Sequence, residues 1–479
     1  MDPSASARPI TPADSNYLVI SDLHLRGGFT DRTERLYHFD EEFADFLRYY
    51  RLHRTSTRPW TLIINGDFIE FHYVTDLPDP DDRLLHGATF SAREQVYGAG
   101  RDAQKSRWKL DRILRSCHPQ LLLALARFLA EGNHIVILSG NHDSEHFFPD
   151  VQEHFRRLIA EHHPDDIGYL AMKEAVAQRL HFAPWCWYVP GVLWVEHGCQ
   201  YDQFCSFRHV LNPVVPAQPA LIESSISDLS IRYFANQVKL LDAMAVENIA
   251  STTEYIGWVL RGHRDFVTRA ARLYAGMVRH VLAKSGRPKR AAEQEVRAEH
   301  ARRAAANDVR FGLPEGTSAA VQALHAVPVM RRPYRTLRFL GVDLLAAGAV
   351  LLGLVPYVLV VSSSGAASVG LAIIVTALAA LVYEGRRRAR RIFDYRHLSR
   401  LAARIAARVG VPHVIFGHSH QAGAWPLANG GTYFNVGTWV PLAKQAYFVY
   451  LAITTDGPAP TAGLWRWHKA RREPERFDG

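Results

Sequence analysis

Acidic and histidine side chains recur in short motifs of regular spacing in this sequence. The motifs are Asp22-x-His24, Gly66-Asp67-x-x-Glu70, Gly140-Asn141-His142-Asp143, His197-Gly198 and Gly417-His418-Ser419-His420. An i,i+2 spacing puts both members of a pair on one side of an extended chain, as for Asp22 with His24. Together the motifs supply carboxylates, an amide oxygen and imidazoles, which are typical ligands of divalent metal ions.

This mixed set of oxygen and nitrogen ligands suits Mn²⁺, Fe²⁺ or Zn²⁺ better than Ca²⁺ or a thiolate zinc site. Two carboxylates, one amide and four imidazoles are too many ligands for one ion. We therefore expect two divalent ions bridged by a carboxylate, with positions left for water and substrate.

Buried strands are expected to position these residues. Residues 17–25, 61–70 and 134–143 are each a short apolar, β-branched run that ends in polar residues, as in strands that deliver side chains at their carboxyl ends. Helical stretches at Phe39–Arg51 and Pro119–Ala130 separate them, which indicates a βαβ alternation. Further strands are predicted in His181–His197, Pro412–Gly417, Thr432–Val436 and Ala446–Thr454.

The motifs and their order resemble the calcineurin-like metallophosphoesterase superfamily. DxH, GDxx(D/E), GNH(D/E), an isolated His-Gly and GHxH follow one another here in the family order. The resemblance covers about residues 17–215 and 393–465. It implies a four-layer α/β/β/α sandwich and two-metal hydrolysis of a phosphoester or pyrophosphate bond by metal-activated hydroxide.

The resemblance also implies roles for single residues. His142 would contact the phosphoryl group, together with Asn141, and help the leaving group depart, while Glu70 would orient His142. The ligands of the first metal would be Asp22, His24, Asp67 and His420. Asp67 would bridge to a second metal held by Asn141, His197 and His418. Three further carboxylates, Asp143, Glu145 and Asp202, are candidates to support these residues, whereas His72 is interpreted as structural or solvent-facing.

SDLHL and GDFIE look closest to the bacterial branch that contains the UDP-2,3-diacylglucosamine pyrophosphohydrolases. The sequence departs from that branch at two positions. His142 stands where those enzymes typically have Arg, and Cys199 stands where they have Asp. These two departures weaken the inference that this chain shares the nucleotide-lipid substrate of that branch.

Two long apolar runs predict a membrane anchor. Phe339 to Val361 contains one charge, Asp343, and Ala366 to Tyr383 contains none. Each run is about long enough to cross a ~30 Å hydrocarbon core. Arginines cluster only outside the pair, at 331–338 and 386–391, so we expect a transmembrane hairpin with both flanks in the cytoplasm. The alternative is a buried helical hairpin in a large domain.

Charge and cysteine content narrow the class of protein. The net charge of +9 equals the nine arginines of those two clusters, which favours a focal anchor on anionic lipids over a surface that coats nucleic acid. The four cysteines form no CxxC pair and indicate a reducing compartment. We therefore expect no nucleic-acid partner and a location of the bacterial inner-membrane type, with the catalytic domain in the cytoplasm.

The predicted organisation interrupts a catalytic domain with an insertion. Residues 1–216 and 393–479 would form the metallophosphoesterase domain, 217–330 a helical insertion, and 331–392 the transmembrane hairpin with its Arg-rich flanks. The predicted function is a membrane-associated phosphohydrolase that uses two metals, Mn²⁺ being favoured, on a lipid-linked substrate. The alternatives are a membrane-tethered nucleotide or cyclic-nucleotide phosphodiesterase and a non-catalytic scaffold. A nuclease is disfavoured by the placement of the basic residues.

Overall fold

The fold was analysed in a computed structural model of the chain. It describes residues 15–27, 38–54, 57–74, 77, 87–237, 264–284, 290–339, 365, 369–370, 373, 375–377, 395–441 and 446–478. These residues form a mixed α/β structure with two large sheets and one two-stranded sheet.

The first large sheet has seven strands. Its order is β14 (Glu473–Arg476), β13 (Thr461–His468), β12 (Val449–Thr454), β1 (Asn16–Ile20), β2 (Trp60–Asn65), β3 (His134–Leu138) and β4 (Leu180–Ala183). Strands β1 to β4 are parallel, whereas β12 pairs with β1 in the antiparallel direction. The carboxyl ends of β1, β2 and β3 therefore meet at one edge.

The second sheet has five strands. Its order is β10 (Gly423–Pro426), β11 (Thr432–Asn435), β9 (His413–Phe416), β6 (Leu193–Glu196) and β5 (Cys186–Val189). Strands β6 and β9 are parallel neighbours, so their carboxyl ends also lie together. A separate pair consists of β7 (Val214–Val215) and β8 (Gln218–Ile222), and β8 is a strand at the start of the segment 217–330, for which the sequence predicted helices.

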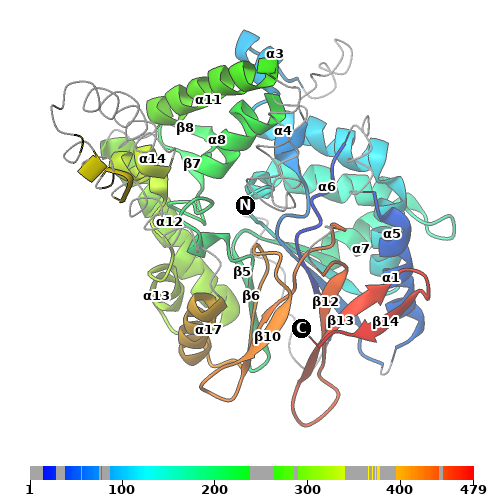
Figure 1. Ribbon diagram of the computed structural model, residues 1–479. Helices are drawn as coiled ribbons and strands as arrows, with labels where there is room; N and C mark the ends of the chain where they lie inside the picture. The colour runs from blue at the N-terminus through cyan, green and yellow to red at the C-terminus, as the bar shows by residue number, and fades with distance from the viewer. Residues whose placement is uncertain are drawn as a thin grey trace.

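Helices cover the outer faces of both sheets (Figure 1). On the first sheet lie α1 (Asp40–Leu52), α5 (Pro119–Ala130), α6 (Pro149–Glu161) and α7 (Tyr169–Arg179), and on the opposite side of the molecule lie α12 (Arg290–Phe311), α13 (Thr317–Gln322) and α17 (Tyr395–Val409). The remaining helices are α3 (Ala92–Tyr97), α4 (Ala103–Leu110), α8 (Ile226–Tyr233), α11 (Arg264–Lys284) and α14 (Pro333–Phe339), with short helical turns at Phe71–Tyr73, Asp111–Arg115, Ser144–Phe147, Cys199–Tyr201, Ala235–Gln237 and Val329–Arg331.

The side chains of β1 show how the layers are held together. Leu18 and Ile20 point into a core shared with the helices of the first sheet, whereas Tyr17 and Val19 join a second core that contains strands of the other sheet. This alternation follows from the two-residue period of a strand. Both faces of β1 are buried, which explains why its sequence reads as a continuous apolar run.

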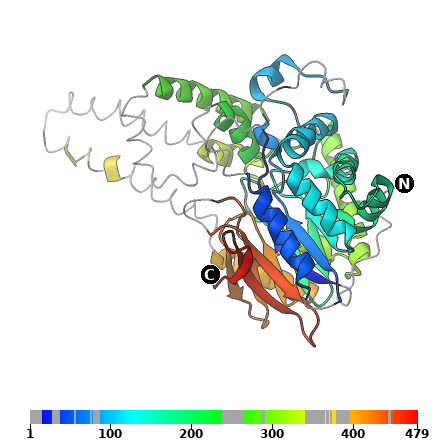
Figure 2. The same ribbon diagram turned by 90° about the vertical axis from the view of Figure 1, so that its right-hand side faces the viewer.

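The group formed by α8 and α11 lies at one end of the two sheets. Figure 2, turned by 90°, shows α11 (green) at the end of the molecule opposite to the C-terminal strands (orange to red). The capping box of Ser225 and Asp228 begins α8, because each side chain accepts a hydrogen bond from the backbone N–H of the other. A small apolar cluster that includes Leu229, Met277 and Val281 joins α8 to α11.

The predicted transmembrane hairpin must be corrected. No helix among the described residues is both long enough and apolar enough to cross a membrane. The fold class that included this hairpin is therefore wrong in that part, and so is the membrane localisation derived from it. Residues 340–364 and most of 366–383, which suggested the hairpin, lie outside the described residues.

Candidate metal centre

The predicted ligands lie together where the carboxyl ends of five strands meet. Asp22 and His24 follow β1, Asp67 follows β2, Asn141 follows β3, His197 follows β6, and His418 and His420 follow β9. Every predicted ligand except His418 is at most 5% exposed. The side chain of His418 is 10% exposed, and that of His142, which lies beside the ligands, is 13% exposed. The last of the predicted site residues, Glu70, is fully buried beside them.

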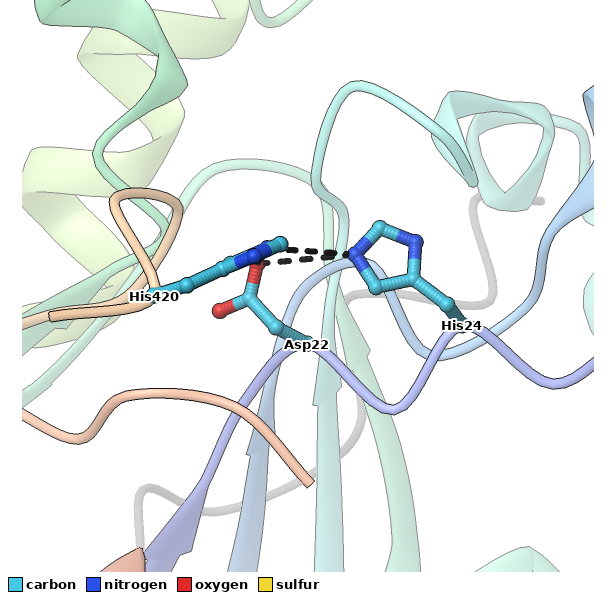
Figure 3. Close-up of side chains that lie close together, drawn as sticks. All are labelled: Asp22, His24 and His420. Carbon is cyan, nitrogen blue, oxygen red and sulfur yellow. Dashed lines mark hydrogen bonds and ion pairs between the residues drawn. The ribbon is translucent and has the colours of Figure 1, made fainter. Parts of the chain in front are cut away.

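One group of ligands consists of Asp22, His24 and His420, whose ligand atoms lie within 4.8 Å of one another. Figure 3 shows the three side chains pointing toward one another, with His420 arriving from a different segment of the chain. Asp22 Oδ1 lies 3.1 Å from His420 Nε2 and 3.8 Å from His24 Nε2. At this spacing, the three atoms could all contact one metal ion placed between them.

A second group consists of Asp67, His197 and His418. Asp67 Oδ2 lies 3.2 Å from His197 Nε2 and 3.9 Å from His24 Nε2, so this carboxylate stands between the two groups. Asn141 adds an amide whose oxygen and nitrogen are both buried and hydrogen-bond to no other described residue. A buried amide without a partner is costly, and a metal ion at this position would satisfy its oxygen.

The backbone is strained at these residues. Asp22, His24, Asp67, His418 and His420 all have φ between +46° and +62°. This left-handed conformation is uncommon for residues other than glycine. Five of the eight non-glycine residues with positive φ in the described chain are thus predicted ligands. Strain of this kind persists where the surrounding structure enforces it, and it clusters at functional sites.

Hydrogen bonds fix the ring orientations of two ligands. His197 Nδ1 lies 2.8 Å from the backbone oxygen of Asn65, which can only accept, so Nδ1 donates and Nε2 is left to face Asp67. His418 Nε2 lies 3.3 Å from Asp202 Oδ2. A carbonyl or carboxylate behind a ligand histidine is the usual way in which proteins orient such rings.

Glu70 contacts two histidines. Its Oε2 lies 2.8 Å from His142 Nδ1 and 3.0 Å from His24 Nδ1. Burial alone would raise the pKa of Glu70, but His142 and His24 outweigh that effect and hold it below its usual range. Burial also opposes a charged His142, yet Glu70 and Asp67 raise the pKa of this imidazole to about 10. His142 is therefore placed to hold a proton at neutral pH.

The carboxylates at the centre stay ionised. Burial would raise the pKa of Asp22 and of Asp67, but neighbouring histidines lower it to about 2 for Asp22 and well below its ordinary value for Asp67. Buried carboxylates this close together need cationic partners. The chemistry of the residues therefore fits a bound metal ion.

Other described groups could also hold a metal ion. One is Asp202, Cys205 and His418, which shares a histidine with the second group, and another is His38, Asp40 and His118. A third consists of His24, Asp67 and His142. Burial and nearby carboxylates raise the pKa of the Cys205 thiol well above its ordinary value, which disfavours the thiolate that a metal needs.

One residue near the centre, His72, was not singled out as a site residue in the sequence. The side chain of His72 is 5% exposed and lies beside His142, with the two ring centroids 5.4 Å apart, and it contacts Asp228 of helix α8. No local pattern indicates this pairing, because the partners come from distant segments. The supporting role of Asp143 is clearer in the structure, where its carboxylate accepts hydrogen bonds from the backbone N–H groups of Phe68 and Gly140.

Comparison with protein-family models gives no match, and no curated protein sequence is significantly similar to the chain. The resemblance of the motifs therefore stays a prediction.

Proposed function

We propose that this protein is a metal-dependent phosphoesterase with two divalent ions, Mn²⁺ being favoured over Fe²⁺ or Zn²⁺. The observation that carries the proposal is the position of Asp67, whose carboxylate stands between two groups of buried ligand residues. The order of the motifs along the chain supports the same assignment.

Each residue has a defined part in this proposal. Asp22, His24 and His420 would hold the first ion, and Asn141, His197 and His418 the second, with Asp67 shared between them. When bound, two ions would lower the pKa of a water molecule between them and neutralise charge on the phosphoryl oxygens.

His142 is proposed as the proton donor to the leaving oxygen. Glu70 accepts a hydrogen bond from Nδ1 of His142, which leaves Nε2 as the nitrogen that can donate to substrate. Glu70 raises the pKa of His142, which favours the protonated ring that such a donor needs. Glu70 thus orients the ring and stabilises its positive charge.

The predicted lipid-linked substrate had two supports. The transmembrane hairpin is corrected above, whereas the resemblance of SDLHL and GDFIE to the nucleotide-lipid pyrophosphohydrolases stays a prediction. The proposal keeps the bond class, a phosphoester or a pyrophosphate. A panel of monoesters, diesters, cyclic nucleotides and nucleotide pyrophosphates then identifies the bond that is cleaved and tests the alternative of a nucleotide phosphodiesterase.

The test is hydrolysis by the full chain with Mn²⁺ against the same protein in chelator. Asp67→Asn removes a charged ligand at nearly constant size, and we expect it to lower kcat by about a hundredfold or more, since loss of an outer partner already costs about 10- to 100-fold. Asp166→Asn, at an exposed carboxylate, is the matched control and should keep full activity. Equal activity in Asp67→Asn and wild type, or none with any metal, would support the scaffold instead.

A further inference from the structure

A chain of buried polar side chains joins helix α8 to the loop that carries Asn141 and His142. Its two central members are Asp228, 2% exposed, and His72, whose side chain is 5% exposed. Asp228 belongs to the segment between the two parts of the catalytic domain, and His72 follows β2. The contact therefore links the inserted segment to the candidate metal centre.

The hydrogen-bond roles at His72 are set by its neighbours. Its Nε2 lies 3.4 Å from the backbone oxygen of Asn141 and 3.4 Å from Asp228 Oδ1. The carbonyl oxygen can only accept, so Nε2 carries the hydrogen and donates it to Asn141. Asp228 Oδ1 faces the same nitrogen at ion-pair distance and accepts no hydrogen bond from any described residue. The backbone oxygen of His72 accepts a 2.7 Å hydrogen bond from Asn236 Nδ2, which again comes from the insertion.

Asp228 is itself held in place from two sides. Its Oδ2 accepts a hydrogen bond from the backbone N–H of Ser225 at 2.8 Å and from Arg101 at 2.6 Å. Arg101 also donates to both carboxylate oxygens of Glu145, at 2.8 and 3.2 Å. Glu145 lies three residues after His142, so the chain of contacts returns to the loop that it supports.

We propose that Asp228 and His72 position the Asn141–His142 loop. Helix α8, which carries Asp228, would in this way help to hold Asn141 at the second metal position. This inference rests on the proposed function, because it assumes that Asn141 binds metal together with His197 and His418. His72 touches the backbone of a ligand residue and no reacting atom, so it is a positioning residue. Without its N–H, the Asn141 carbonyl loses a buried donor and the loop is free to shift.

The test is titration of the metal-stripped full chain with Mn²⁺ alone, followed by calorimetry. His72→Phe keeps a ring of similar size but removes the donor. We expect it to weaken one of two Mn²⁺ sites by about 10- to 100-fold and to leave the other unchanged. His72→Gln, which retains an N–H donor, should restore most of that affinity. His53→Phe, at an exposed ring stacked on Tyr49, is the matched control.

Activity gives a second readout. His72→Phe should lower kcat at saturating substrate and recover at high Mn²⁺, which a general loss of fold would not do. Should that variant fail to fold, Asn236→Ala removes the other hydrogen bond to His72 and should weaken the same site to a smaller degree. Unchanged Mn²⁺ binding in whichever of these variants folds would overturn the inference.

The wild-type titration separates the two proposals. If wild type binds two Mn²⁺ ions and the variants do so equally well, only the role of Asp228 and His72 is lost. If wild type binds no Mn²⁺, both the proposed function and this inference are overturned.

Discussion

At the scale of single residues, the site depends on carboxylates that serve two partners each. Asp67 lies between two groups of predicted ligands. Glu70 lies within hydrogen-bond distance of the Nδ1 atoms of both His24 and His142. A predicted metal ligand and the predicted proton donor are thus oriented by the same side chain. In the sequence, the GDxx(D/E) motif indicated only that Glu70 could orient His142.

Glu70→Gln tests this shared role. His142 Nδ1 lies 2.8 Å from one oxygen of Glu70 and 2.9 Å from the other. Whichever way the glutamine amide is placed, its N–H₂ therefore faces the Nδ1–H of His142, so at least one ring must turn. We expect kcat to fall by about 10- to 100-fold and Mn²⁺ affinity to fall as well. Hydrolysis rates and Mn²⁺ titration measure the two effects. A fall in kcat with unchanged Mn²⁺ affinity would show that Glu70 supports His142 alone.

At the scale of strands and their following loops, glycines allow neighbouring strand ends to approach. A Cβ at Gly140 would overlap Asp67 Oδ1, and one at Gly66 would lie 2.6 Å from the His197 ring. Both glycines are next to predicted ligands in the sequence. The close approach explains why glycine precedes Asp67 and Asn141. A side chain at Gly140 would displace the Asp67 carboxylate, and one at Gly66 would displace the His197 imidazole.

Gly140→Ala is therefore expected to damage the site more than the fold. The added methyl group pushes the Asp67 carboxylate away from His197, which should weaken Mn²⁺ binding by about tenfold or more, while overpacking costs about 1–3 kcal/mol of stability. Gly168→Ala is the control, because a Cβ there meets nothing within 4 Å. Mn²⁺ titration and urea unfolding measure the two quantities, and wild-type Mn²⁺ affinity in Gly140→Ala would contradict the expectation.

The elements that carry the ligands were largely predictable from sequence. The apolar runs gave the strands β1, β2, β3 and β9, and the helical stretches at Phe39–Arg51 and Pro119–Ala130 correspond to α1 and α5. Periodicity and burial act within a few residues, so such elements leave a local signature. The contact of Asp228 with His72 leaves none, because it depends on how the insertion packs. The apolar runs after Phe339 had the right length for a membrane span, but no described helix is long and apolar enough to cross a membrane, and most of these runs lie outside the described residues.

At the scale of the whole molecule, the segments before and after the insertion are joined through both sheets. Strand β12 pairs with β1, and β9 pairs with β6, so the segments before and after the insertion share both large sheets. The predicted ligands His418 and His420 reach the site through this pairing. Stability of the entire sandwich and integrity of the site are therefore coupled.

Acid should weaken this sandwich through two histidines, of which His146 is buried and His413 is partly buried. Burial lowers the pKa of His146, beside the first sheet, and of His413, in the second sheet, to about 4 each. In the unfolded chain both would titrate near the ordinary value of about 6.5. Below that pH the unfolded state binds protons that the folded state does not bind. The free energy of unfolding therefore falls as the pH drops from about 6.5 to about 4.

Each histidine should remove about 2 kcal/mol of unfolding free energy between pH 7 and pH 5, at about 1.4 kcal/mol per pH unit below 6.5. His413→Phe keeps an aromatic ring next to Phe434 but cannot take up a proton, so its loss over that range should be smaller than that of wild type by this amount. Urea unfolding in chelator measures the difference without a contribution from metal release, and His53→Phe, at an exposed ring, should follow wild type. Parallel pH profiles for wild type and His413→Phe would mean that His413 takes up its proton equally in the folded and unfolded chain. Acid sensitivity would then have to arise elsewhere in the sandwich.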